Sequence, residues 1–277
     1  MSVMKTIILE LEAKRNGYCQ ITRKRGWLNY LKGSELAFDH DNLRHTIETV
    51  VNNDKPRGEK LFCPEPHFKF TMTADKKPSR PEEALERFIV NTNRDYFCNQ
   101  ISIGGRKESI DIGIKEKNGT FTFLELKPWA STNSPMYAIV ECLKNLTQYR
   151  TLLKEGKHRI ERFETVNLMV LAPLSYYQQY ELLDGSGNVY TRAASTVSRL
   201  LGNIGNAFKT TVTLMALNID RNDFDGKCAQ IYDVRKVRNQ GKVELNESDT
   251  IPSLKRDQWK QVATGTPPWC SFTAHAT

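Results

Sequence analysis

The amino-acid sequence predicts an α/β protein in which helices flank a mixed central β-sheet. Three observations predict this fold class. Three strand-like segments follow one another from residue 97 to residue 126, a long helical segment comes next, and an apolar run without alternation then predicts a strand buried on both faces. A strand meander followed by a crossover helix and a further strand gives both antiparallel and parallel neighbours in one sheet.

The first helix of this unit is predicted to begin near residue 80. Ser79, Pro81 and the acids Glu82 and Glu83 are typical start signals, and the apolar residues that follow recur at helical spacing. Glycine-containing turns then separate the three strands, which are expected at 97–103, 109–115 and 120–126. Later elements are expected as a helix over 135–154, a strand over 167–172, helices over 175–183 and 191–208, and a strand over 211–217.

The chain is predicted to divide into three parts. Residues 1–79 form an N-terminal extension or small accessory domain, with one short amphipathic helix over 42–50. Residues 80–220 form the α/β core. Residues 221–277 form a polar C-terminal extension that docks on the core or frays, with Trp259 and Trp269 as its large anchors beyond residue 239.

Composition and charge favour a polyanionic partner. Forty Lys and Arg residues against 32 Asp and Glu give a formal charge of +8, and such a surface attracts phosphate groups. No apolar run approaches the roughly 18 residues of a membrane span, and charge interrupts the N-terminal segment too early for a signal peptide. We therefore expect a cytoplasmic protein with no membrane partner and with reduced cysteines.

Two acids and a lysine stand in otherwise apolar strands: Asp111, Glu125 and Lys127. Buried charges are costly unless they are paired or bind a metal ion, so these residues are the candidates for a site. Glu125 and Lys127 are two residues apart on one strand, and their side chains therefore share a face.

The loop between the strands decides whether Asp111 joins that face. A two-residue turn would place Asp111 opposite Leu126, on the other face of the hairpin. A three-residue loop with Gly119 in the left-handed conformation pairs Glu116 with Thr120 and sets Asp111 opposite Glu125. We predict the three-residue loop. Two facing carboxylates repel each other unless a cation lies between them, which favours Mg²⁺ or Mn²⁺.

The pattern Asp111…Glu125-Leu126-Lys127 resembles the motif of the PD-(D/E)XK nuclease superfamily. The resemblance covers about half of the chain, and Ile110 stands where the motif has its proline. It implies a restriction-endonuclease-like core with the element order αβββαβαβ. It also implies that Asp111, Glu125 and the Leu126 carbonyl bind the metal ion and that Lys127 assists the attacking water. Glu86 on the preceding helix would complete the site as a ligand or base, with Glu83 as the second choice.

The resemblance further implies metal-dependent hydrolysis of phosphodiester bonds, in DNA rather than RNA, within restriction, defence or recombination. The chain would then be an endonuclease or exonuclease that acts alone, as a homodimer or as a subunit of a larger complex. Nucleic-acid contacts are expected from Arg25, Lys76, Lys77 and Tyr149, with Trp27 and Tyr30 near Arg25 as stacking residues.

Other interpretations of the same residues stay open. The fold could carry a catalytically inactive nucleic-acid-binding or assembly module. Glu125 and Lys127 could equally lie on an exposed strand face of a structural or partner-binding protein. These alternatives differ in metal-dependent cleavage and in salt-sensitive binding to DNA.

Overall fold

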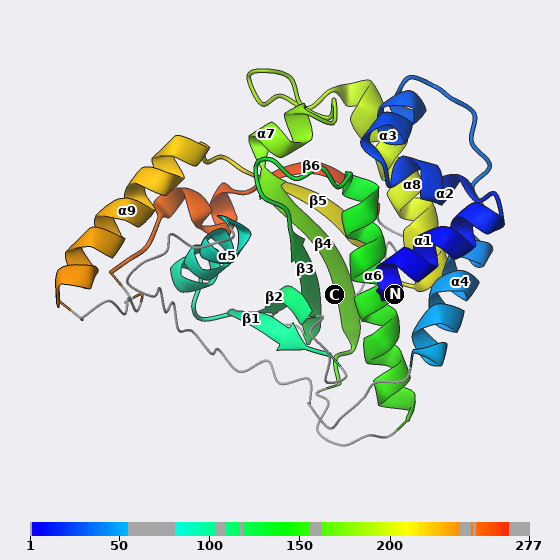
Figure 1. Ribbon diagram of the computed structural model, residues 1–277, viewed down its shortest axis with the longest axis horizontal. Helices are drawn as coiled ribbons and strands as arrows, with labels where there is room; N and C mark the ends of the chain where they lie inside the picture. Colours follow the sequence, from blue (N-terminus) through cyan, green and yellow to red (C-terminus); the bar gives the residue numbers. More distant parts are fainter. Residues whose placement is uncertain are drawn as a thin grey trace, which may run out of the picture.

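The computed structural model describes residues 2–54, 81–103, 109–116, 119–155, 162–238, 245 and 248–265. Within them, six strands form one curved sheet in the order β1-β2-β3-β4-β5-β6 (Figure 1). The strands are β1 (Phe97–Ser102), β2 (Ser109–Lys115), β3 (Thr120–Leu126), β4 (Thr165–Pro173), β5 (Val212–Leu217) and β6 (Lys260–Gly265).

The sheet is mixed. The first three strands form an antiparallel meander, β4 and β5 continue the sheet in parallel with β3, and β6 pairs antiparallel with β5. The connection from β3 to β4 runs through a long helix, as parallel strands require. The predicted fold class, a mixed sheet flanked by helices, is confirmed.

Helices cover both faces of the sheet. The helices of the predicted core and those that follow it are α5 (Pro81–Thr92), α6 (Pro135–Lys154), α7 (Leu174–Gln178), α8 (Thr191–Phe208) and α9 (Arg221–Arg238). The N-terminal part adds α1 (Val3–Ala13), α2 (Gly17–Ile21), α3 (Lys24–Leu31) and α4 (His40–Asn53). None of the helices in the described ranges is long and apolar enough to cross a membrane.

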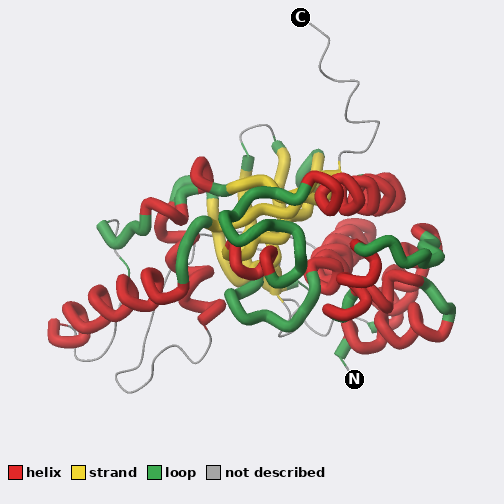
Figure 2. The backbone as a smooth tube through the Cα atoms, turned by 90° about the horizontal axis from the view of Figure 1, so that it is seen from above, coloured by secondary structure: helices red, strands yellow, loops and turns green. Residues whose placement is uncertain are grey.

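Two hydrophobic clusters hold these layers together, one on each face of the sheet. The larger one joins α6, α8 and the N-terminal helices to the strands, with Trp27, Phe123 and Tyr149 among its fully buried rings. The smaller one packs α5 and the start of α9 on the opposite face, around Phe88 and Phe224. Figure 2 shows the strands between these two groups of helices.

Helix α6 begins at Pro135, the residue predicted from the sequence. The hydroxyl of Ser134 accepts a hydrogen bond from the Tyr137 amide, and Pro135 occupies the first turn. Ser134 also donates to the carbonyl of Ile21, which ties the helix start to the end of α2. Because α6 packs directly on β3 and β4, its polar residues reach the end of the strand hairpin.

Several elements differ from the sequence prediction. The helix predicted over 175–183 ends at Gln178, because the chain turns through a left-handed Glu181 with a φ of 56°. Residues 2–54, the described portion of the N-terminal part, form four helices where one was predicted. α9 and β6 were not predicted, since their sequences carry few apolar residues. β6 is held by pairing with β5 and by packing against α8, so the expected C-terminal extension contributes a strand to the central sheet.

Candidate active site

The hairpin of β2 and β3 has the predicted register. Ile112 pairs with Leu124 and Lys115 with Phe121, while the amide of Glu116 donates to the carbonyl of Thr120 over 2.9 Å. Gly119 has the left-handed φ of 76° that the three-residue loop requires. The prediction of this register is therefore confirmed, and its next step sets Asp111 opposite Glu125.

The backbone of β3 fixes the Asp111 side chain. The amide of Leu126 donates to Asp111 Oδ2 over 2.9 Å, so the carboxylate bridges the two strands where their ladder ends. Asp111 also lines the pocket described below. Leu126, whose carbonyl is the expected metal ligand, lies between Glu125 and Lys127 at the end of β3.

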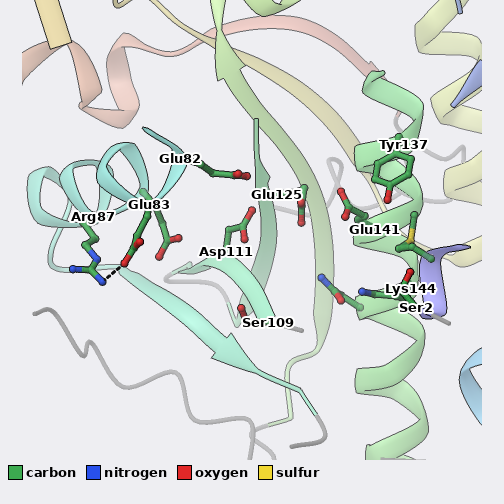
Figure 3. A pocket seen from close by; sticks show the side chains of 13 residues that line it. Ser2, Glu82, Glu83, Arg87, Ser109, Asp111, Glu125, Tyr137, Glu141 and Lys144 are labelled. Atoms are coloured by element: carbon green, nitrogen blue, oxygen red, sulfur yellow. Dashed lines mark hydrogen bonds and ion pairs between the residues drawn. The ribbon is translucent and has the colours of Figure 1, made fainter. Parts of the chain in front are cut away.

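Asp111 and Glu125 line a cavity of about 620 Å³ between the hairpin, α5, α6 and the start of α1 (Figure 3). Two cations, Arg87 and Lys144, also line it. Among the described residues that line the cavity, six are acids: Glu82, Glu83, Glu86, Asp111, Glu125 and Glu141. A chain with a formal charge of +8 therefore contains a strongly acidic pocket.

Lys127 lies beside this pocket and is almost fully buried, with 5% of its surface exposed. Its Nζ donates to Glu125 Oε1 over 2.6 Å and to Glu141 Oε2 over 2.7 Å. Asp111, Glu125 and Lys127 thus meet in one cluster, as expected from the sequence.

Sequence reasoning missed Glu141, which comes from α6. One pattern in the sequence could have revealed it. Helix α6 is largely apolar, but four of its polar residues recur at helical spacing and form a stripe: Glu141, Lys144, Asn145 and Gln148. Lys144, Asn145 and Gln148 are buried. A buried polar stripe of this kind indicates a site rather than a solvated helix face.

Burial and mutual repulsion perturb the charges of the cluster. Burial raises the pKa of Asp111 to about 8, although the charge of Lys127 opposes the shift. Burial, together with the Asp111 carboxylate, raises the pKa of Glu125 to about 7. Burial and Glu125 likewise raise the pKa of Glu141 to about 8. Burial alone would lower the pKa of Lys127, but Glu125 and Glu141 hold it well above its usual value. Because these pKa values lie at or above neutral pH, protons as well as Lys127 neutralise part of the cluster when no metal ion is bound.

The glutamates of α5 differ in their surroundings. Glu86 is 2% exposed, and its charge raises the pKa of Asp111 further. Glu83 is more exposed and forms an ion pair with Arg87 at 2.5 Å, one turn along the helix. Both line the pocket, and burial beside Asp111 distinguishes Glu86, the first choice from the sequence.

The donor set suits a hard divalent cation, because the pocket offers several carboxylate oxygens in a negatively charged, partly desolvated environment. Within the described ranges, no three Asp, Glu, His or Cys side chains are already assembled as a metal-binding group. The cation that contacts Glu125 is the Lys127 ammonium. A metal ion would thus bind to carboxylate oxygens that share this pocket, and it would compete with Lys127 for Glu125.

Those expected nucleic-acid-binding residues that the structure describes do not line the pocket. Arg25 is exposed on α3 but does not line the pocket, and Lys76 and Lys77 lie outside the described residues. The expectation for Tyr149 is wrong in this structure, because its ring is buried against Phe123 and its hydroxyl accepts a hydrogen bond from the Phe163 amide.

Trp27 likewise cannot stack on bases, since its ring is fully buried and its indole N–H donates to the carbonyl of Tyr180. Tyr30 is partly buried and packs edge-on against Phe38. The N-terminal aromatic residues therefore belong largely to the hydrophobic core.

Comparisons with known proteins add no relative. No family model, no curated protein and no solved structure matches the chain.

Proposed function

We propose that the chain is a metal-dependent nuclease that hydrolyses phosphodiester bonds, with DNA as its substrate. Residues 80–220 would form a PD-(D/E)XK, restriction-endonuclease-like core. The observation that carries this proposal is the meeting of Asp111, Glu125 and Lys127 at the end of one hairpin, with Glu86 beside them in the same acidic pocket.

The charge of the pocket supports a metal ion in this proposal. Once ionised, the pocket carboxylates would repel a phosphodiester group, and a bound divalent cation would displace their protons and neutralise their charge. Asp111, Glu125, the Leu126 carbonyl and Glu86 would hold Mg²⁺ or Mn²⁺. Such an ion polarises the phosphate and lowers the pKa of bound water.

The chain's own residues would do the remaining work. Lys127 places a protonated amine at the pocket, where it can orient the attacking water or stabilise the negative charge that develops on the phosphate. The formal charge of +8 attracts DNA to the protein as a whole. The protein surface thus attracts the DNA, and the metal ion makes the acidic pocket able to accept its phosphate group.

The proposal predicts cleavage of supercoiled plasmid or of labelled single strands with Mg²⁺ or Mn²⁺, and none with excess chelator. The reason is that, without a divalent cation, nothing in the pocket lowers the pKa of the attacking water or polarises the phosphate. Gel assays at low salt measure this directly, with Ca²⁺ as a control for binding without turnover. Salt-sensitive DNA binding without cleavage in either metal would instead support an inactive binding module.

A further inference from the structure

Two carboxylates from different elements bind the Lys127 ammonium. Glu125 lies two residues earlier on β3, and Glu141 lies on α6, with distances of 2.6 Å and 2.7 Å to Nζ. The Lys127 side chain is 6% exposed and that of Glu141 21%. The lysine is therefore held from two directions inside the protein.

We infer that Glu141 is a positioning residue that holds the Lys127 ammonium at the pocket. This inference rests on the proposed nuclease function, in which Lys127 acts on the water or on the phosphate. Lysine has a flexible four-carbon stem, so a single partner on its own strand leaves the position of the amine poorly defined. A second carboxyl partner on a separate element fixes that position.

Helix α6 is suited to this role because its own position is fixed. Ser134 caps its first turn and binds the end of α2. Leu143 and Leu146 are fully buried in the larger hydrophobic cluster. The backbone of Glu141 is therefore held in a fixed position, and its carboxylate fixes the position of the Lys127 ammonium through their contact.

Glu141 also complements Glu125. In the proposed function Glu125 binds the metal ion, so its charge is shared between that ion and Lys127. Glu141 remains as a carboxylate partner of the amine. Holding Lys127 in place is thus a separate task from binding the metal ion, and different residues would carry the two tasks.

Three variants separate this role from its alternatives: Glu141→Ala, Glu141→Gln and the control Glu155→Ala. Glu155 is exposed at the end of the same helix. Glu141→Ala is expected to lower kcat by about 10- to 100-fold, the usual cost of losing a residue that orients a functional group. KM for DNA and the Mn²⁺ concentration at half-saturation should change less than about threefold, because the metal ligands and the DNA contacts are untouched. Glu141→Gln should recover most of the rate, because its amide oxygen still accepts a hydrogen bond from the ammonium.

A second measurement needs neither metal nor turnover. Acetylation of lysines in chelator, followed by mass spectrometry, should modify Lys127 at least about fivefold faster in Glu141→Ala, because the amine is less firmly held. Lys154, exposed on the same helix, serves as the internal reference. Urea unfolding of each variant shows that the protein compared is folded.

The outcomes are distinguishable. If the wild type cleaves DNA and Glu141→Ala cleaves it equally fast, the inference fails while the nuclease function stands. If both Glu141 variants raise the Mn²⁺ requirement more than about tenfold, Glu141 is a metal ligand and the inference is wrong. If the wild type cleaves no DNA in either metal, the proposed function fails and the positioning role fails with it.

Discussion

Replacing Asp111 by asparagine is expected to abolish DNA cleavage and, in metal-free solution, to stabilise the fold. Cleavage is lost because the amide is a poor ligand for a hard divalent cation and cannot replace the charge of the carboxylate. The fold survives because the amide oxygen that Asp111→Asn introduces can still accept the hydrogen bond from the Leu126 backbone. A stable but inactive variant separates a functional charge from a structural one.

The gain in stability has a defined pH dependence. Burial raises the pKa of Asp111 from 3.8 to about 8, so the folded protein binds this proton more tightly than the unfolded chain does. Ionisation therefore costs stability as the pH rises from about 4 to about 8. One pKa unit corresponds to about 1.4 kcal/mol. We expect Asp111→Asn to gain about 1–3 kcal/mol at pH 8, because pocket water screens part of the cost, and nothing below about pH 4.

Urea unfolding in chelator at pH 4 and pH 8 measures this difference. The matched control is Asp257→Asn, since Asp257 is exposed in the short 3₁₀ turn Arg256–Gln258. The control should change the free energy of unfolding by less than about 0.5 kcal/mol at either pH. An Asp111→Asn protein that is less stable at pH 8, or that still cleaves DNA at the wild-type rate, would contradict this account of the pocket.

Replacing Lys127 by methionine should also abolish cleavage, but with the opposite effect on stability. Methionine fills much of the space of the lysine stem but removes the ammonium, with its charge and its hydrogen-bond donors. Glu125 and Glu141 then remain buried without their cation, and breaking a buried pair in this way costs about 3–5 kcal/mol. The expected result is a large decrease in the urea midpoint at pH 8.

Two further variants show that charge causes this loss. Adding Glu125→Gln and Glu141→Gln to Lys127→Met removes the uncompensated carboxylates and should restore at least about half of the lost stability. Lys32→Ala breaks an exposed ion pair with Glu181, whose side chains are 64% and 48% exposed, and should change stability by less than about 1 kcal/mol. If Lys127→Met costs no more than Lys32→Ala, the buried ion-pair network does not stabilise the fold as we describe.

The strand hairpin could be predicted from the sequence because its determinants are local. Gly119 supplies the left-handed residue of the loop, and the alternation along β2 and β3 then sets Asp111 opposite Glu125. The bounds of α6 were likewise predicted from the helical spacing of its apolar residues. In each case, neighbouring residues determine the conformation.

The rest of the site depends on packing between distant elements. Glu141 reaches Lys127 only because α6 lies on β3, a contact that the spacing along the chain does not specify. Trp27 and Tyr149 carry polar groups, and a sequence cannot show that core carbonyls and amides bind them. β6 has few apolar residues of its own and is stabilised by β5 and α8.

The central claim is that Asp111 and Glu125 bind a divalent metal ion in this pocket. Calorimetric titration of Mn²⁺ into the wild type and into Asp111→Asn tests it most directly, with Asp257→Asn as the control. We predict saturable binding to the wild type and the control, weakened at least about 10-fold in Asp111→Asn, as expected when one ligand of a small set is lost. Equal Mn²⁺ binding by all three proteins, or no saturable binding by the wild type, would contradict the claim.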